Sequence, residues 1–269
     1  MAPRFGLSTR LVHGARLEPR HLALMARHGF STLELAATRT HFDYADPGAV
    51  QSLATALGDA GLTLHAVSAP RAEGVRGRTW VVPFSPASDD AAERKHALDE
   101  IRLAIALAGT VPYAVLVVHL ERPGTPGDAA PESMSSARKS LEEITRATED
   151  AGVQLALASG SGPLSRPDVL VRIIERELDE HRVGICLDYG HAHLHGGVAD
   201  AIDEAGEHLI AAHLPDSGAL PWDHAMMSTQ KIGYDGVLTF DVDGGPDPEA
   251  ALQRAARTRD RLADLVVAF

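Results

Sequence analysis

The chain has 269 residues, 45% of them hydrophobic and only 4% aromatic, so a sizeable core built mainly from aliphatic side chains is expected. Its formal net charge of −12 and the lack of a lysine and arginine cluster argue against a general nucleic-acid binder. Cys186 is the only cysteine, which excludes an intramolecular disulfide. With no signal-peptide core and no run of ~20 apolar residues, we expect a cytoplasmic protein that stays away from membranes.

Eight short segments have the pattern of β-strands. Most of them are apolar nearly throughout, as expected for parallel strands that helices cover on both faces. They span residues 5–8, 32–36, 62–67, 114–120, 153–158, 183–188, 209–214 and 236–242.

Longer segments with helical periodicity alternate with these strands. Proline near the start and glycine after the end mark two of them, which open around Pro19 and Pro47 and stop at Gly29 and Gly61. The predicted helices span residues 18–28, 47–60, 89–108, 132–151, 167–179 and 248–268, with a weak one near 198–205. Residues 215–235 contain no convincing helix.

Eight strands alternating with about seven helices indicate a (β/α)8 TIM barrel, and the lack of a linker-like break indicates a single domain over residues 1–269. An open, doubly wound sheet is the alternative. It is disfavoured because no G-x-G-x-x-G sequence follows the first strand. The sequence leaves the oligomeric state open, including a homo-oligomer.

Six of the eight predicted strands carry, near their carboxyl ends, a residue that can bind a metal ion or transfer a proton. In a (β/α)8 barrel these ends meet at one rim, where active sites lie. A single acid after a strand is more often a turn former or helix cap, but six converging strands favour a site. Mixed carboxylate and imidazole donors suit a divalent ion such as Zn²⁺, Mn²⁺ or Co²⁺. The residues are Glu34, His65, His119, Asp188, His213 and Asp241.

The same segments resemble the xylose isomerase-like TIM barrels, the group of sugar phosphate isomerases and epimerases that also contains endonuclease IV. The most specific part is GICLDYGHAHL, an apolar run followed by Asp188 and, three positions later, His191. IAAHLPDSG followed by WDH is similar to the family's strand-seven motif, and GYDGVLTFDVDGG to its strand-eight ending. LVVHL and TLHAV match strands four and three. His193 and His195 have no counterpart in the signature and are expected to be loop residues.

The resemblance implies a divalent metal ion (Mn, Zn, Co or Mg) bound by Asp188, His213 and Asp241. It also implies that Asp241 and His191 are catalytic and that His191 contacts the substrate. Trp222 can stack on a sugar ring, and Glu34 can bind the substrate or orient His65. The predicted substrate-binding set is His65, His119, His191, Glu34 and Trp222, and Asp216, Asp223 and His224 are additional candidates on the strand-seven loop.

Three departures from the family pattern bear on function. The family has Glu at the end of strand five, in a pattern like LALEN, whereas this chain reads LALAS with Ala158 at that position. Asp241 replaces the usual Glu of strand eight and is one methylene shorter. Only AMMSTQKI separates His224 from Gly233, so the helix between strands seven and eight is expected to be shortened or absent.

These features favour an isomerase- or epimerase-like enzyme that transfers a proton next to a carbonyl of a sugar or small hydroxy-carbonyl compound. Its metal site would be degenerate, because alanine at position 158 cannot bind metal. A catalytically impaired barrel that binds a sugar or a partner is the alternative. A metal-dependent phosphodiesterase of the endonuclease IV type is disfavoured by the acidic balance and the missing glutamate.

Overall fold

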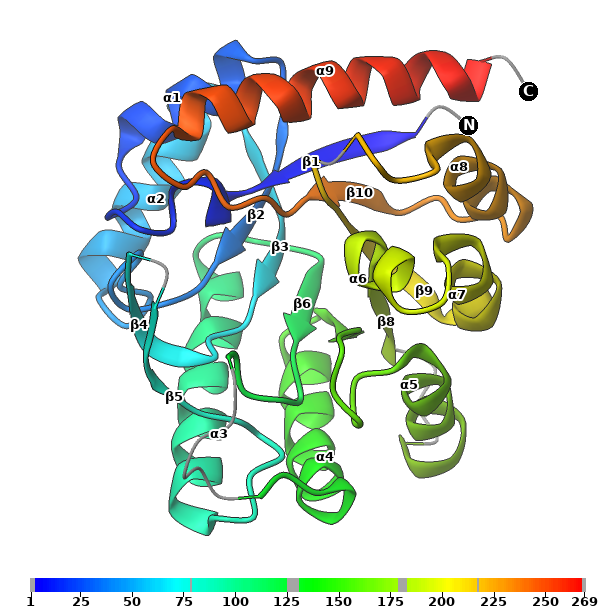
Figure 1. The fold of residues 1–269 in the computed structure, drawn as a ribbon. Helices are drawn as coiled ribbons and strands as arrows, with labels where there is room; N and C mark the ends of the chain where they lie inside the picture. The colour runs from blue at the N-terminus through cyan, green and yellow to red at the C-terminus, as the bar shows by residue number, and fades with distance from the viewer. Residues whose placement is uncertain (1–2, 78, 125–130, 179–182, 217, 268–269) are drawn as a thin grey trace.

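The computed structural model describes residues 3–77, 79–124, 131–178, 183–216 and 218–267. Eight parallel strands form a closed barrel in the order β1, β10, β9, β8, β7, β6, β3, β2 (Figure 1). The strands are β1 (Arg4–Ser8), β2 (Thr32–Ala36), β3 (Thr63–Ser68), β6 (Val115–Val118), β7 (Gln154–Ala158), β8 (Val183–Asp188), β9 (Leu209–Leu214) and β10 (Val237–Phe240). Closure of the sheet confirms the predicted barrel and rules out the doubly wound alternative.

Helices follow most of the strands and surround the barrel (Figure 1). The α-helices are α1 (Pro19–Arg27), α2 (Pro47–Ala60), α3 (Ala91–Ala106), α4 (Met134–Asp150), α5 (Pro167–Ile173), α6 (Tyr189–Leu194), α7 (Val198–Ala205), α8 (Trp222–Lys231) and α9 (Pro248–Val267). Short 3-10 turns η1 (Thr9–Val12), η2 (Leu107–Gly109) and η4 (Gly206–His208) and the π-helical turn η3 (Ile174–Leu178) complete them. Within the described ranges, no helix is both long enough and apolar enough to cross a membrane.

The predicted element boundaries agree closely with the structure, since all eight strands and all seven expected helices occur. The residues whose types predicted the start and end of α2 have those roles in the structure. The Asp46 carboxylate accepts from the backbone N–H groups of Gly48 and Ala49, Pro47 is the first helical residue, and Gly61 ends the helix in the left-handed region with a φ of 66°.

Two helices and one hairpin were not predicted. The expectation that residues 215–235 lack a helix is wrong, because α8 forms there over ten residues and buries Trp222, Ala225 and Met226. Its apolar face is short, so the periodic signal is weak in the sequence. The helix α6 directly follows β8. An antiparallel hairpin of β4 (Ala72–Arg76) and β5 (Thr79–Pro83) follows β3.

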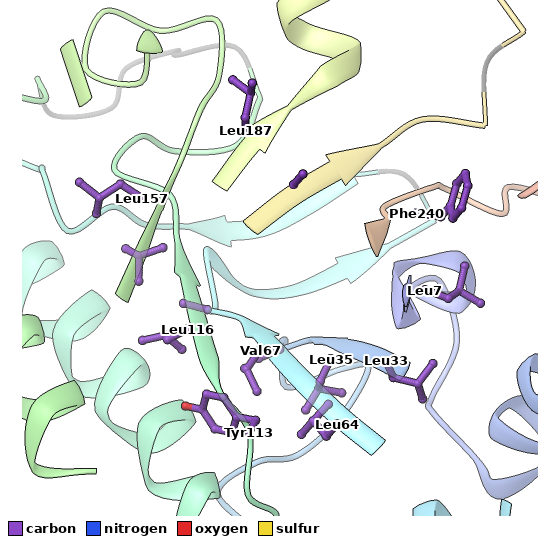
Figure 2. Packing of buried hydrophobic residues seen from close by; sticks show 14 of the residues in the cluster. Leu7, Leu33, Leu35, Leu64, Val67, Tyr113, Leu116, Leu157, Leu187 and Phe240 are labelled. Carbon is purple, nitrogen blue, oxygen red and sulfur yellow. The ribbon is translucent and has the colours of Figure 1, made fainter. Parts of the chain in front are cut away.

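The core has two layers because alternate strand residues face opposite sides of the sheet. Larger side chains face the helices, and Figure 2 shows Leu35, Leu116 and Leu187 among them. The second buried cluster holds only small and β-branched side chains contributed by five strands: Ala66, Val115, Val117, Ala156, Ala158, Cys186 and Ala211. This small-residue layer leaves room for longer polar side chains at the carboxyl ends of the same strands.

Gly184→Ala in β8 is expected to lower the free energy of unfolding by about 1–3 kcal/mol, because overpacking forces the surrounding backbone to shift. A Cβ at this position would lie 2.7 Å from the carbonyl oxygen of His208 and from side-chain carbons of Ile210. Urea denaturation measures the change. Gly58→Ala in α2, where a Cβ meets no atom within 4 Å, is the control and should add about 0.5–1 kcal/mol. Equal stability of the two variants would contradict the close approach.

Candidate functional site

A cavity of 620 Å³ opens at the carboxyl ends of the barrel strands. Ala36, Ser68 and Asp188 end strands β2, β3 and β8 and line it, which identifies the rim where (β/α)8 barrels carry their active sites. Ionisable side chains from several segments of the chain reach the same space. They include Arg10, Arg71, His119, Glu121, Arg122, Glu132, Asp188, His191, His213 and Asp241.

Asp241 lies directly after β10 and forms an ion pair with Arg10, which η1 presents just after β1. The distance between Nη1 of Arg10 and Oδ2 of Asp241 is 2.6 Å. Burial raises the pKa of Asp241, but Arg10, His213 and a hydrogen bond from Ser8 outweigh it, so its pKa lies well below the usual value. Asp241 is therefore an ionised carboxylate whose charge Arg10 already balances.

His213 in β9 connects two carboxylates. Its Nε2–H donates to Oε2 of Glu34 at 2.9 Å, and its Nδ1 lies 3.9 Å from Oδ2 of Asp241. Burial lowers the pKa of His213, but Cys186, Glu34 and Asp241 outweigh it and hold the pKa well above the usual 6.5. Since burial raises the pKa of the Cys186 thiol, that group is uncharged at neutral pH, and the two carboxylates are the anions that act on the imidazolium.

His119, which follows β6, experiences the opposite electrostatic environment. Burial and the positive charges of Arg71 and His213 lower its pKa well below 6.5, so the imidazole is neutral at neutral pH. One cavity thus contains a neutral imidazole and a protonated one. Environments that push the pKa values of two groups apart are typical of acid and base pairs in active sites.

Asp188 and His191 are joined by the local structure of the signature segment. The Asp188 carboxylate caps α6 by accepting from the backbone N–H of His191 at 2.9 Å, and the Ser159 hydroxyl accepts from the N–H of Asp188 at 2.8 Å. The His191 ring stacks on His195 with 6.0 Å between centroids. The interpretation of an acid after a strand as a helix cap therefore applies to Asp188, although this residue also lines the cavity.

Several residues predicted from the sequence lie elsewhere. His65 is not among the described residues that line the cavity, because a register shift lets Ala66 pair with Glu34 and take the inward position. Burial and the positive charge of Arg4, at the start of β1, lower the pKa of His65. Glu34 is 2% exposed and contacts His213 rather than the cavity.

The candidates on the loop after β9 are also placed away from the cavity. Trp222 begins α8 and is 2% exposed in the core, so its ring cannot stack on a ligand at the rim. Asp216 forms an ion pair with Arg254 at 2.8 Å, and Asp223 and His224 are exposed on α8. None of the four is among the described residues that line the cavity, because α8 turns this segment outward.

Arg10 and Arg71, two of the three described arginines that line the cavity, are not in the predicted set of site residues. Arg10 lies two residues beyond Ser8, the end of the first strand, and Arg71 lies three residues beyond Ser68, the end of the third. The sequence signal was an arginine shortly after a strand end. For Arg10 the signal was missed because the prediction rested on metal-ligand residue types at the strand ends themselves.

The donor set does not fit a divalent ion in this arrangement. A search of the described residues finds no group of three His, Cys, Asp or Glu side chains placed to hold one. Asp241 forms an ion pair with Arg10, and Nε2 of His213 donates to Glu34. The Asp188 carboxylate caps α6. At position 158 the family's carboxylate is absent, and the guanidinium of Arg10 adds positive charge beside Asp241. Asp188, His213 and Asp241 as metal ligands stay a prediction.

Comparison with known families agrees with this geometry. The profile described as "Xylose isomerase-like TIM barrel" matches residues 22–262. The chain belongs to this family. A curated relative, the uncharacterized protein MJ1311 of Methanocaldococcus jannaschii, is 28% identical over 182 residues, which cover 59% of this chain and 62% of that protein. The chain therefore spans less than two thirds of the length of the curated relative that it matches.

Solved structures of the same architecture include sugar epimerases. D-psicose 3-epimerase from Clostridium cellulolyticum H10, crystallised with D-tagatose, superposes with a TM-score of 0.79 and 16% identity over 97% of this chain and 99% of the epimerase. The IOLI protein with a bound zinc atom superposes with a TM-score of 0.75 and 16% identity over 97% of this chain and 98% of that one. At such identities the similarity is one of fold alone.

Proposed function

We propose that the protein is a sugar isomerase- or epimerase-like enzyme that moves a proton on a carbon next to a carbonyl group. The single observation that carries the proposal is the meeting of a neutral imidazole, a protonated imidazole and a carboxylate in one rim cavity of 620 Å³. A ketose has a volume that such a cavity accommodates. The similarity in fold to D-psicose 3-epimerase, crystallised with D-tagatose, supports the same substrate class.

The residues suggest a division of roles in proton transfer. His119, being neutral, can accept a proton from the substrate carbon, while the imidazolium of His213 can donate to, or stabilise, the developing oxyanion. Asp241 is placed to hold Arg10 and His213 in position or to act as a base itself. The catalytic assignments of Asp241 and His191 belong to this proposal.

The proposal includes a degenerate metal site. When bound, a divalent ion would polarise the carbonyl and stabilise negative charge on its oxygen. Asp188, His213 and Asp241 would be its ligands, but Ala158 and the pairing of Asp241 with Arg10 weaken that set. We infer that binding of Mn²⁺ or Zn²⁺ is weak and that Arg10 supplies part of the positive charge.

A sugar-binding barrel without catalysis is the second candidate. Ala158 favours it, because a two-base epimerisation needs an acid–base group on each face of the sugar and alanine supplies none. His119 argues for the enzyme, since it offers a second proton acceptor from a neighbouring strand.

Solvent exchange distinguishes the two candidates. The purified chain is incubated in D₂O with D-fructose, D-tagatose or D-psicose, in EDTA and separately in excess Mn²⁺, and deuterium at the carbons next to the carbonyl is measured by NMR. We expect incorporation above the buffer rate, with at most a modest gain from Mn²⁺. Asp188→Ala should leave the EDTA rate within a few-fold of wild type.

Two results would count against the proposal. Ligand-induced thermal stabilisation without any exchange would favour the binding barrel. Exchange that disappears in EDTA and returns with stoichiometric Mn²⁺ would overturn the degenerate metal site while leaving the proton transfer intact.

A further inference from the structure

Arg71 stands out among the cations of the cavity. It follows the end of β3 and directly precedes the β4–β5 hairpin, whose two strands are labelled in Figure 1. Arg71 is one of the residues that line the cavity. The guanidinium carbon lies 5.8 Å from the centre of the Trp80 ring, which β5 carries on the other strand of the hairpin. An aromatic ring at this distance favours a cation and limits how the guanidinium can turn.

Arg71 has few partners for a half-buried guanidinium. Its Nη2 donates to the backbone carbonyl of Glu121 at 3.1 Å, and its Nε is buried without a hydrogen-bond partner. Across the described part of the chain, no carboxylate lies within ion-pair distance of it. The other two arginines of the cavity differ, because Arg10 pairs with Asp241 and Arg122 pairs with Glu93, both at 2.6 Å.

The surroundings of Arg71 do not supply a compensating charge at close range. Glu121 lies close to Arg71 in the fold, but its carboxylate oxygens accept from the backbone N–H of Leu164 and the hydroxyl of Ser165. Burial and the positive charge of Arg10 lower the pKa of Arg71 to about 10, against the opposing effect of the Asp241, Glu121 and Glu132 carboxylates, so the guanidinium is protonated at neutral pH. A half-buried cation with no carboxylate in direct contact is costly, and a ligand anion that contacts it would lower that cost.

We propose that Arg71 is the anion-binding residue of this cavity and that the substrate carries a carboxylate or phosphate group on the part of the molecule remote from the reacting carbonyl. This inference rests on the proposed function for the reaction, and it adds the substrate class. The planar donors of a guanidinium match the paired oxygens of either group. Trp80 provides the wall against which this end of the substrate lies.

The separation of positive charges supports this division of the cavity. Arg10 is neutralised by Asp241 beside the reacting groups, whereas Arg71 retains its charge. A substrate with one anionic end therefore has one preferred orientation, with that end at Arg71 and the carbonyl towards His119 and His213.

Binding of three sugars that differ in one substituent tests the proposal without requiring turnover. D-glucose, D-glucuronate and D-glucose 6-phosphate are titrated by calorimetry at low ionic strength into wild type, Arg71→Gln, Arg71→Lys and Arg76→Gln. Arg76 is exposed on the same hairpin and serves as the matched control. Inorganic phosphate and acetate are titrated as probes that need no sugar contacts, and circular dichroism checks that each variant is folded.

We expect at least one of the two anionic sugars to bind wild type about tenfold or more tighter than D-glucose. Arg71→Gln should abolish that preference, Arg71→Lys should keep part of it, and Arg76→Gln should keep all of it. Which anionic sugar is preferred separates a carboxylate from a phosphate substituent.

Three results would overturn the proposal. They are equal affinity for neutral and anionic sugars, an unchanged preference in folded Arg71→Gln, and failure of every anionic probe to bind wild type better than Arg71→Gln. Deuterium exchange into a neutral ketose would support the proposed reaction whichever way these titrations turn out, so the two failures are distinguishable.

Discussion

Asp241→Asn is expected to lower kcat/KM for proton exchange by about 10²- to 10⁴-fold, the range that a positioned acid or base contributes. Asparagine keeps the shape of the side chain but removes the charge that pairs with Arg10 at 2.6 Å and lies 3.9 Å from Nδ1 of His213. The loss affects the reaction whether Asp241 is itself the base or holds the other two groups in place. Deuterium incorporation into the ketose identified by the exchange assay measures the change.

A surface aspartate provides the control. Asp203→Asn removes a 2.8 Å ion pair with Lys231 on the outside of the barrel, and exposed pairs contribute little, so this variant should exchange at the wild-type rate. A rate for Asp241→Asn within threefold of wild type would show that the carboxylate takes no part in proton transfer.

The pH profile of the wild-type rate follows from the two imidazoles. His119 is a base only when neutral, and its pKa lies well below 6.5, so the acid limb should fall below that value. His213 is an acid only when protonated, and its pKa lies well above 6.5, so the alkaline limb should lie above it. We expect a plateau that spans 6.5 in kcat/KM, and a single limb centred there would contradict these assignments.

The barrel was predictable because its signals are local. Apolar runs, helix periodicity and the Pro and Gly punctuation around α2 depend on neighbouring residues, and the strands 32–36, 183–188 and 209–214 have the predicted bounds. The rim position of Asp188, His213 and Asp241 follows from topology alone, because parallel strands bring their carboxyl ends together.

The pairing of side chains was not predictable, because it depends on register and on contacts distant in sequence. A register shift beside Glu34 places Ala66 inward and leaves His65 away from the cavity. Glu34 and His213 are 179 positions apart and meet only in the closed barrel. Arg10 in turn reaches Asp241 across 231 positions, which changes the expected metal ligand into one half of an ion pair.

The residues expected to bind a metal ion have other partners in the structure. The segment around Asp188 and His191 retains the family's order of residues, but the structure uses the Asp188 carboxylate as a cap and Arg10 as a counter-ion. Ala158 contributes no negative charge, and the guanidinium of Arg10 contributes a positive one beside Asp241. The proposed weak metal binding rests on this distribution of charge.

His213→Leu is expected to lower the free energy of unfolding by about 3–5 kcal/mol, because it leaves Glu34 buried without its partner. Glu34 is 2% exposed and its Oε1 already lacks a hydrogen bond, so no other group can take over. Replacing Glu34 by Gln in the same chain removes the buried charge and should recover part of the loss. Urea denaturation measures both, and His208→Leu, which breaks a 3.5 Å surface contact with Glu175, should stay within about 0.5 kcal/mol of wild type.

The sign of the pH dependence gives this prediction a second readout. Because the folded-state pKa of His213 is raised, its stabilising contribution is fully present below the unfolded value of 6.5 and is lost as pH rises through the folded pKa. Buried neutral histidines act in the opposite sense, since His13 and His41, each with a pKa lowered to about 4, cost stability as pH falls below 6.5. The difference between wild type and His213→Leu cancels those contributions. Below 6.5 the difference also reflects protonation of the unpaired Glu34 carboxylate in the variant. It should shrink as pH rises through the folded pKa of His213, and a difference that keeps growing across the alkaline range would mean that His213 is neutral in the folded protein.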